Sequence, residues 1–537
     1  MKTVFYNASV YTGKFPLCHA FIVEDGRFTH VGNNDEILSL ASSGASRVDL
    51  NGCFVCPGFN DSHMHLLGFG NSLGTAQLAS HTGSLEELLD YMRSFLAASP
   101  LRCGQWILGR GWNQDLFSDT HRMPNRYDLD TVSRDIPILL TRACGHCCIV
   151  NSKALELAGI GPDTPAPEGG TIGCEDGKAD GRLFDNAIEL IHRILPLPGT
   201  NDIQDMLLRA CKTVNRYGIT SVQTDDYQVF PGISWNQINE AYRSLSDRGD
   251  LSLRVYEQAQ FTKPDELLYF IESGHKTGTG NHMFRIGPVK LLGDGSLGSR
   301  TAYLSRPYAD SSVTRGFPLF SADQMNAMIT CAHENDMQLA VHAIGDSCLD
   351  QVLDGIEQVL KMKPRCDHRH GIVHCQITRP DQLKRIRDLH LHVYAQSIFL
   401  DYDNHIVAKR VGPELASSSY NWKTLINQGV SVSNGSDCPV ELPDVMAGIQ
   451  CAVTRRSLDG TGPYLPDQAF TVKEALDSFS IRGAEASFEE KVKGKIFPGY
   501  LADFVVLTEN PFDMDPFLIK QIPIAACFVG GECVYEK

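Results

Sequence analysis

No stretch of this chain is apolar for long enough to cross a bilayer. The 537 residues are 42% hydrophobic and 21% charged, which is ordinary globular composition. Polar residues interrupt every hydrophobic run before the roughly 20 residues that a membrane-spanning helix needs. The segment Met1–Asn7 lacks the apolar core of a signal peptide for the same reason. We therefore expect a cytoplasmic protein.

Positive charge is also in short supply. Acidic residues outnumber basic ones by 64 to 48, and the net charge is −16. A surface of that sign repels phosphate backbones and anionic lipid head groups, so the composition argues against nucleic acid and membranes as partners. We expect a small-molecule substrate, and a homodimer is the default oligomeric state.

The 17 cysteines lack the regular spacing of a disulfide framework, which predicts reduced thiols. Cys53 and Cys56 form Cys-x-x-Cys inside an apolar run, and this setting favours buried thiols over a redox pair. Cys144 and Cys147 flank His146 and could hold a structural zinc. No second cysteine pair with finger spacing follows them, which argues against that site.

Short strands punctuated by glycine stand at both ends of the chain, which is longer than one average domain. We expect residues 1–57 and 488–537 to pair into one small β-sandwich domain. The main domain then spans 58–487. Its residues from about 70 to 200 mix helix, strand and loop patterns, with a loop over 161–181, and we interpret them as an insertion that covers a site.

From about residue 200 helical patterns and strands alternate regularly. Alternation of this kind implies parallel pairing of the strands. With the strand that ends at His65, the pattern makes eight strands and predicts an α/β fold, a closed (β/α)8 TIM barrel whose chemistry lies at the carboxyl ends of the strands. The later strands are expected over 218–224, 251–257, 284–292, 338–342, 369–374, 390–396 and 430–437.

His63 and His65 stand at the end of the first strand, after the break at Pro57-Gly58. Alternate residues of a strand face the same side, so both imidazoles can reach one divalent metal. Two surface histidines at a strand end would give the same pattern. The other strand ends must therefore decide between these explanations.

The later strand ends do supply further ligands. Lys290 lies in strand four, His342 ends strand five, His374 ends strand six and Asp437 ends strand eight. Each alone has an ordinary explanation, such as a core histidine, a capping aspartate or a snorkelling lysine. Six such residues at five strand ends predict a metal site.

Motifs along almost the whole chain resemble those of the amidohydrolase superfamily. The resemblance is closer to its YtcJ-like branch, which includes N-substituted formamide deformylase, and it implies a barrel with a small composite β-domain. The motifs lie at 57–65, 109–114, 145–146, 151–155, 289–300, 342–346, 372–376, 435–440 and 494–507.

That family uses two metal arrangements. In the binuclear type a carboxylated lysine on strand four bridges two metals, which implies Lys290 as the bridge. In the mononuclear deaminase type a glutamate follows the strand-five histidine by three residues, and here that position is Gly345. We therefore expect two zinc ions, although iron and manganese also suit such ligands.

In the binuclear arrangement the buried metal binds His63, His65 and Asp437, and the exposed metal binds His342 and His374. The alternative is an unmodified Lys290 that binds substrate or a carboxylate. One metal would then be held by His63, His65, His374 and Asp437 or a similar subset.

The resemblance implies hydrolysis of a C–N bond of the amide type in a small organic substrate. Metal-activated hydroxide would attack, and Asp437 would act as the catalytic proton shuttle. A lactone or ester hydrolase on the same site is one alternative. A non-catalytic scaffold with this fold is another, although every ligand position is filled.

Substrate-binding residues are expected in the insertion and after strand four. The alternative for each is a structural role, either packing the insertion or pairing with a neighbouring charge. The candidates are Trp112, Asn113, Gln114, His146, Asp294 and Arg300.

Overall fold

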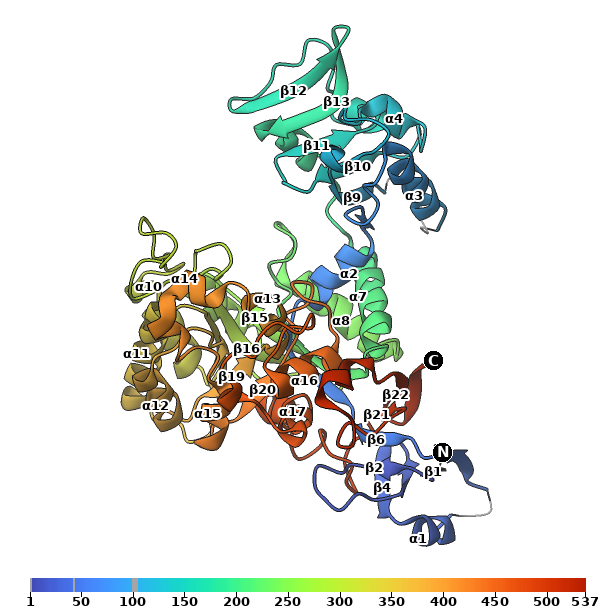
Figure 1. The fold of residues 1–537 in the computed structure, drawn as a ribbon, viewed down its shortest axis with the longest axis vertical. Coiled ribbons are helices and arrows are strands. Elements are labelled where there is room, and N and C mark those ends of the chain that lie inside the picture. Colours follow the sequence, from blue (N-terminus) through green and yellow to red (C-terminus); the bar gives the residue numbers. More distant parts are fainter. Residues whose placement is uncertain (1, 42–43, 99–104) are drawn as a thin grey trace. The chain divides into compact units, whose positions relative to one another are not determined.

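The computed structural model describes residues 2–41, 44–98 and 105–537 (Figure 1). The chain divides into two compact units. One is formed by Met1–Phe69 with Leu207–Lys537, and the other by Gly70–Met206. The second unit spans nearly the residues that the sequence predicted as an insertion.

Parallel strands in chain order form the central sheet of the first unit. The first and last of them approach each other, and just after the last strand the Asp437 amide donates a hydrogen bond of 2.8 Å to the His63 carbonyl. This nearly closed barrel confirms the predicted (β/α)8 fold. Its eight strands are β7 (Phe59–Met64), β14 (Ile219–Thr224), β15 (Arg254–Gln260), β16 (Phe284–Leu292), β17 (Leu339–Ala343), β18 (Gly371–His374), β19 (His392–Ala395) and β20 (Val432–Asn434).

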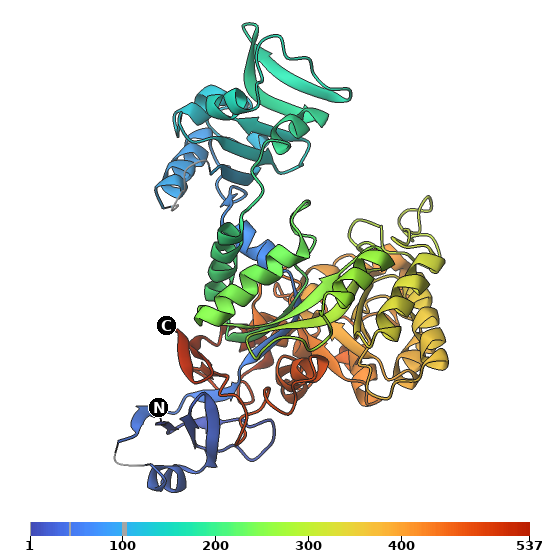
Figure 2. The ribbon, with the colours of Figure 1, turned by 180° about the vertical axis from the view of Figure 1, so that it is seen from behind.

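Helices predicted between the strands are present and lie outside the barrel. Figure 2 shows α8 and α9 on the outer side of the strands β14 to β16. Local sequence sets their ends: Ser234 caps α8 by accepting from the Gln237 amide, and Gly249 ends it with a φ of 73°. The predicted helices are α7 (Thr200–Asn215), α8 (Trp235–Arg248), α9 (Pro264–Glu272), α10 (Ala322–Glu334), α11 (Asp346–Met362), α12 (Pro380–Asp388) and α15 (Trp422–Asn427). A further helix, α17 (Val472–Ser478), follows the last barrel strand and was not predicted.

Short helices that the sequence did not predict follow strands β19 and β20. Non-helical backbone at Gly412, followed by Pro413, interrupts the helical pattern of one of them. They follow the carboxyl ends of their strands, which is where the ligands were predicted. They are η3 (Ser397–Phe399), α13 (Leu400–Asp403), α14 (Val407–Ala416) and α16 (Val445–Thr454).

Two small sheets lie beside the barrel in the first unit, and one of them joins both ends of the chain. Strand β6 pairs antiparallel with β21, and the chain then passes at Gly58 into barrel strand β7. The sheets contain β1 (Lys2–Tyr6), β3 (Ala20–Glu24), β4 (Arg27–Gly32) and β5 (Ser46–Asp49), and β2 (Ser9–Val10), β6 (Phe54–Pro57), β21 (Phe504–Leu507), β22 (Ile524–Val529) and β23 (Glu532–Glu536).

Aromatic rings pack between these two sheets, where Phe5 meets Phe504 edge to face. The Phe5 ring lies 5.0 Å from Phe21 and 5.1 Å from Phe504, and Phe504 stacks on Phe528 at 4.4 Å. The sheets and the barrel fall in one compact unit. The domain boundaries near residues 57 and 488 therefore stay a prediction.

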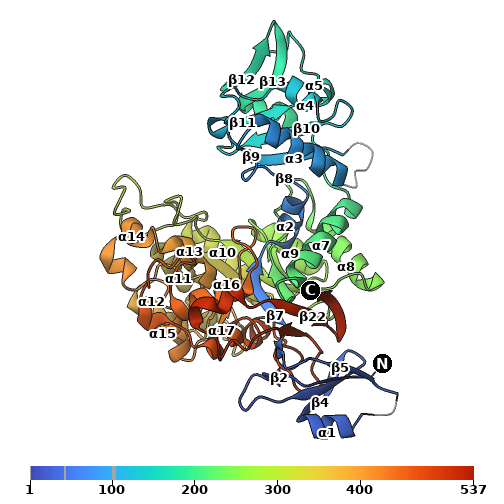
Figure 3. The same cartoon turned by 45° about the vertical axis from the view of Figure 1, so that its right-hand side comes forward.

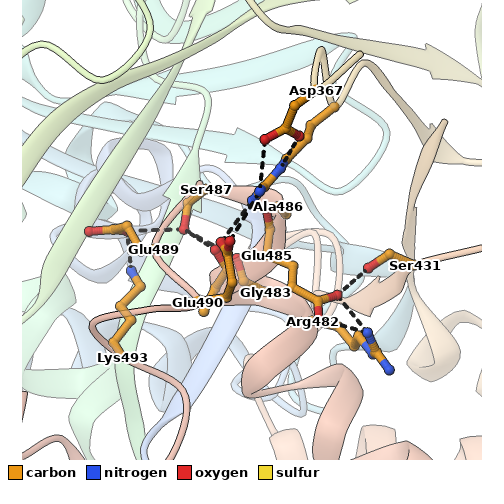
Figure 4. Close-up of polar contacts among 12 residues, drawn as sticks. Asp367, Ser431, Arg482, Gly483, Glu485, Ala486, Ser487, Glu489, Glu490 and Lys493 are labelled. Atoms are coloured by element: carbon orange, nitrogen blue, oxygen red, sulfur yellow. Dashed lines mark hydrogen bonds and ion pairs between the residues drawn. The ribbon is translucent and has the colours of Figure 1, made fainter. Parts of the chain in front are cut away.

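Ion pairs fasten the C-terminal segment after α18 (Ile481–Ala486) to the amino end of β18 (Figure 4). Arg369 donates to the carboxylates of Asp367 and Glu490 and to the carbonyl of Glu485. Burial raises the pKa of Glu489, but Lys493, 2.6 Å away, and Arg285 outweigh it and lower that pKa to about 2. This network lies at the opposite end of β18 from His374.

The second unit is a six-stranded sheet with helices on both faces (Figure 3). Leu88 and Met92 of α3 pack on one face against Leu140, and Leu155 of α5 packs on the other against Val150. The elements are β8 (Ala76–Gln77), β9 (Ile107–Trp112), β10 (Ile138–Arg142), β11 (Cys147–Val150), β12 (Gly170–Glu175), β13 (Lys178–Asp185), α3 (Leu85–Ala98), α4 (Arg126–Asp130), α5 (Ser152–Leu157) and α6 (Glu189–His192).

The loop predicted over 161–181 was wrong in its second half, which forms the hairpin of β12 and β13. Asp176 and Gly177 connect Glu175 to Lys178 with φ values of 50° and 71°. Two positive φ values give a turn whose twist matches that of the flanking strands. The glycine and acidic content of the stretch concealed the hairpin.

None of the helices in the described part of the chain has the length and hydropathy that crossing a membrane requires. Each cysteine that the structure describes is an unpaired thiol, and Cys56 is buried. Burial raises the pKa of Cys56 well above its ordinary value. The predicted burial is therefore confirmed for Cys56, whereas Cys53 is only half-buried.

Candidate metal centre

The structure brings the predicted ligand residues together at the carboxyl ends of the barrel strands. The rings of His63 and His374 lie 5.6 Å apart, and those of His342 and His374 lie 4.5 Å apart. Lys290 Nζ lies 3.1 Å from His63 Nε2. The donors of strands one, four, five and six therefore face one another.

Three of these side chains form a tight cluster. Asp437 Oδ1 lies 3.1 Å from His65 Nε2 and 3.4 Å from His63 Nε2. One donor atom of each residue lies within 4.8 Å of the others, and no further group of this kind occurs among the residues that the structure describes. Two imidazoles and a carboxylate at this spacing suit a divalent metal.

Glutamine side chains set the orientation of two ligand imidazoles. Gln258 Nε2 donates to the Ser62 carbonyl, so its Oε1 faces His63 Nδ1 at 2.9 Å. Gln396 Nε2 likewise donates to the Tyr394 carbonyl and turns its Oε1 to His374 Nδ1 at 2.8 Å. An acceptor at Nδ1 keeps the proton there, which leaves the Nε2 lone pair of both histidines for a metal.

The other two histidines are also held by acceptors. The Asp225 carbonyl accepts from His65 Nδ1 at 3.1 Å. His342 differs, because its Nε2 faces the Asp294 carboxylate and the Gly295 carbonyl, each at 3.2 Å. His65 therefore offers Nε2 and His342 offers Nδ1 as the ligating atom.

Burial and the Asp437 carboxylate act in opposite directions on the histidine charges. Burial lowers the pKa of His63, with Lys290 adding to the effect, and lowers that of His374 to about 3. Burial acts the same way on His65, but the hydrogen bond and charge of Asp437 outweigh it and raise the pKa of His65 to about 9.

The Asp437 carboxylate itself stays ionised. Burial disfavours its charge, but the hydrogen bond from His65 and the proximity of His63 and His374 hold its pKa below the usual range. An ionised carboxylate beside neutral imidazoles is the state that metal binding requires. Among His63, His65 and His374, only His65 carries a proton that would have to leave when a metal binds.

Left-handed backbone occurs at two of the predicted ligands. The φ values of His374, Cys375 and Asp437 are 73°, 50° and 58°. Non-glycine residues adopt this region at a cost, and such strain concentrates at functional sites. The surrounding hydrogen bonds must therefore hold both turns in place.

Sequence reasoning missed Asp61, which ties strand one to strand eight. Its carboxylate accepts from the amide of Ser436 at 3.0 Å, from the Ser436 hydroxyl at 2.5 Å and from the amide of His63 at 3.2 Å. Burial raises the pKa of Asp61 to about 7. The sequence did indicate a role for Asp61, because it stands two residues before His63 and therefore on the same face of the strand.

Asp225 was missed as well. Its Oδ2 lies 3.2 Å from Lys290 Nζ, and its buried Oδ1 has no hydrogen-bond partner among the described residues. Asp225 directly follows β14, where the predicted second strand stopped at Thr224. Its position at the carboxyl end of a strand could have identified it as a site residue. The same holds for Gln258, which lies in β15.

The predicted substrate-side residues of the insertion all lie in the second unit. Trp112 is buried in the core of that unit, and its indole N–H donates to the Leu140 carbonyl at 3.0 Å. Asn113 and Gln114 accept from Arg142, while His146 is exposed with its Nδ1 3.2 Å from Asp185. These contacts are internal to the unit, and binding of substrate by these residues stays a prediction.

The two candidates after strand four make local contacts. Asp294 is buried and accepts from the amides of Tyr303, Ile344 and Gly345, besides facing His342. Arg300 pairs with Asp310, with both nitrogen–oxygen distances at 3.0 Å. Asp294 thus supports a predicted ligand, and a substrate role for either residue stays a prediction.

Comparisons with known proteins match almost the whole chain. The amidohydrolase-named protein YtcJ of Bacillus subtilis (strain 168) is 32% identical over 543 residues, and the alignment covers 100% of both chains. The N-substituted formamide deformylase of Arthrobacter pascens is 25% identical over 548 residues, which covers 99% of this chain and 98% of that one.

Solved structures agree with these relatives. Uncharacterized metal-dependent hydrolases from Pyrococcus furiosus and Pyrococcus horikoshii superpose with TM-scores of 0.77 and 0.76, at 28% and 27% identity. Each alignment covers 96% of this chain, and 100% and 99% of the two hydrolases. The sequence profile of the Amidohydrolase family matches residues 47–535, and the chain therefore belongs to that family.

Proposed function

We propose that this protein is a metal-dependent hydrolase that cleaves a C–N bond of the amide type, other than a peptide bond, in a small organic substrate. The observation that carries the proposal is the cluster of His63, His65 and Asp437 beside His342 and His374. The Pyrococcus structures, described as metal-dependent hydrolases, support the metal. The Arthrobacter relative, named for deformylation of N-substituted formamides, supports the C–N bond.

The donor set fits two zinc ions per chain. His63, His65 and Asp437 would hold one ion, and His342 with His374 would hold the other. Lys290 lies 3.1 Å from His63 Nε2, where its ammonium would repel a cation. Reaction of its neutral amine with CO2 forms an anionic carbamate and releases a proton, and this anion suits a bridging position.

A bound divalent metal would supply two things, a lowered pKa for a water molecule and polarisation of a carbonyl oxygen. Asp437 is the base in this proposal. Its carboxylate is ionised and lies beside His63 and His65, so it is placed to accept a proton from the attacking water. The same proton can then reach the leaving nitrogen, which departs as a neutral amine.

The test starts with the metal content of the purified protein and continues with matched substrates. Pairs of an amide and an ester with the same acyl group, together with N-substituted formamides and lactones, would be assayed before and after chelation. We expect up to two metals per chain and amide turnover that zinc restores. Turnover of esters or lactones alone would favour a lactone or ester hydrolase. An inert protein without metal would favour a non-catalytic scaffold with this fold.

A further inference from the structure

We infer that Trp422 is a positioning residue for His374, and that its indole N–H holds the strained turn that carries this histidine. The inference rests on the proposed metal centre, in which His374 is a ligand. Trp422 itself begins helix α15 and comes from a different part of the barrel wall.

The turn that Trp422 contacts is strained over two consecutive residues. His374 ends strand β18 with a φ of 73°, and Cys375 follows with a φ of 50°. Neither is a glycine, so both backbones occupy a region that L-residues avoid. Two such residues in succession persist only where neighbouring groups fix them.

Hydrogen bonds from residues 420–422 fix this turn. Trp422 Nε1 donates to both strained residues, 3.1 Å from the His374 carbonyl and 3.2 Å from the Cys375 carbonyl. The Tyr420 amide donates to the next carbonyl, that of Gln376, at 2.7 Å. Three successive carbonyls of the turn are thus bound by one short segment. Trp422 is only 1% exposed, so water has little access to replace its donor.

The segment that makes these bonds is itself buried and braced. The rings of Tyr420 and Trp422 meet edge to face at 5.4 Å, and the buried Arg455 guanidinium lies 6.0 Å from the Trp422 ring. Asp403 Oδ2 joins the segment to the turn, because it accepts from the Tyr420 hydroxyl at 2.7 Å and from Gln376 Nε2 at 3.2 Å.

The His374 side chain has further contacts with Gln396 and Phe399. Gln396 sets the protonated nitrogen, and the Phe399 ring lies nearly parallel to the imidazole at 5.9 Å. Both act on the ring and its rotation. The backbone from which the ring projects is set by the turn, and a shift of the turn would move Nε2 away from the other donors without changing the tautomer.

Trp422→Phe tests the inference, because it removes the N–H and keeps a large aromatic ring. We expect about ten- to a hundredfold weaker binding of zinc at the His374 site, the usual effect of losing an outer contact to a ligand. In the metal-free variant, hydrogen–deuterium exchange at the amides of Cys375 and Ile377 should be faster. With Co2+ in place of zinc, the visible absorption spectrum should change.

The chain offers a matched control in Trp112→Phe. Trp112 is also buried and donates its indole N–H to a carbonyl, that of Leu140 in the second unit. This control should reproduce any general loss of stability but leave the zinc affinity, the Co2+ spectrum and the exchange of residues 371–377 unchanged.

The outcomes separate this inference from the proposed function. If wild-type protein binds no metal, the metal centre is wrong and the inference falls with it. If wild-type protein binds metal and Trp422→Phe binds it equally tightly, the inference alone is overturned, even when exchange in the turn is faster. Equal weakening of zinc binding by both variants would also overturn it, because that result indicates a general loss of stability.

Discussion

Gly435 faces the backbone of His63 so closely that no side chain fits between them. A β-carbon at residue 435 would lie 2.6 Å from the His63 nitrogen and 2.7 Å from Asp61 Oδ1. Real β-carbons essentially never approach other atoms below 3.0 Å. The close approach of strand eight to strand one, which brings Asp437 to His63, therefore depends on glycine at this position.

We expect Gly435→Ala to destabilise the protein by about 1–3 kcal/mol, as overpacking does in a rigid core. It should also lower the metal content, because the strand that precedes Asp437 must move. Urea unfolding and metal analysis would measure both. Gly161→Ala is the control, since a β-carbon there meets nothing within 4 Å. Wild-type stability in Gly435→Ala would contradict the close packing.

Replacing Asp437 by asparagine should abolish turnover while the fold remains intact. The amide cannot accept the proton from water, and loss of a general base costs about 100- to 10,000-fold in rate. Circular dichroism and metal analysis would accompany the kinetics, and exposed Asp250→Asn serves as a control. Near-normal activity of Asp437→Asn would reject the proton-shuttle role.

Lys290→Ala should lower the number of metals per chain below the wild-type value. The reason is the loss of the proposed bridging carbamate, and growth with labelled CO2 should give a carbamate carbon resonance in wild type only. Lys290→Arg keeps a cation that cannot be carboxylated and should behave like the alanine variant. Unchanged metal stoichiometry in both variants would mean that no carbamate bridges the metals.

Gln396 should matter through its acceptor oxygen. Gln396→Leu removes the acceptor that keeps the proton on His374 Nδ1, and we expect about ten- to a hundredfold weaker zinc binding. Gln396→Glu keeps an acceptor at the same place and should restore most of that affinity. Equal loss in the leucine and glutamate variants would show that packing, and not the hydrogen bond, is what Gln396 supplies.

Buried neutral histidines at the amino ends of β17 and β18 predict a loss of stability in acid. His370 Nδ1 accepts from the Leu339 amide, and its Nε2 lies 2.8 Å from His333 Nδ1. Burial lowers the pKa of His370, and it lowers that of nearby His368 to about 4. In the unfolded chain each would titrate near 6.5, so the unfolded state binds more protons between these values.

Stability should therefore be fully present above about pH 6.5 and fall as the pH decreases toward 4. His368 alone would account for about 3 kcal/mol at most. Urea unfolding of the metal-free protein at several pH values would measure the slope, and His368→Gln should reduce it. A slope that is the same in this variant would indicate that other groups titrate.

The barrel and most of its site could be predicted from the sequence for one physical reason. Parallel strands between helices place their carboxyl ends on one rim, so His63, His342, His374 and Asp437 could be gathered without knowledge of any contact. The structure brings these residues together as expected.

Contacts of residues at the boundaries of strands could not be predicted. Asp225 and Gln258 stand at or just past the predicted ends of strands two and three, and boundaries are the least reliable part of such predictions. The contact of Trp422 with His374 spans 48 residues and follows no periodicity. The hairpin at Asp176-Gly177 was hidden by composition, because glycine and acidic residues favour loops as much as turns.

The hydrogen bond between His65 and Asp437 joins residues 372 positions apart, and strand β6 finds its partner β21 only near the end of the chain. During synthesis His63 and His65 leave the ribosome long before Asp437 is made. A nascent chain contains the two histidines of the proposed centre through most of translation. The centre is complete only when the last barrel strand packs against the first. In the proposed metal centre, loading of the metal would have to wait until Asp437 has been synthesised, and a chain truncated before Asp437 would present imidazoles with no carboxylate to hold an ion.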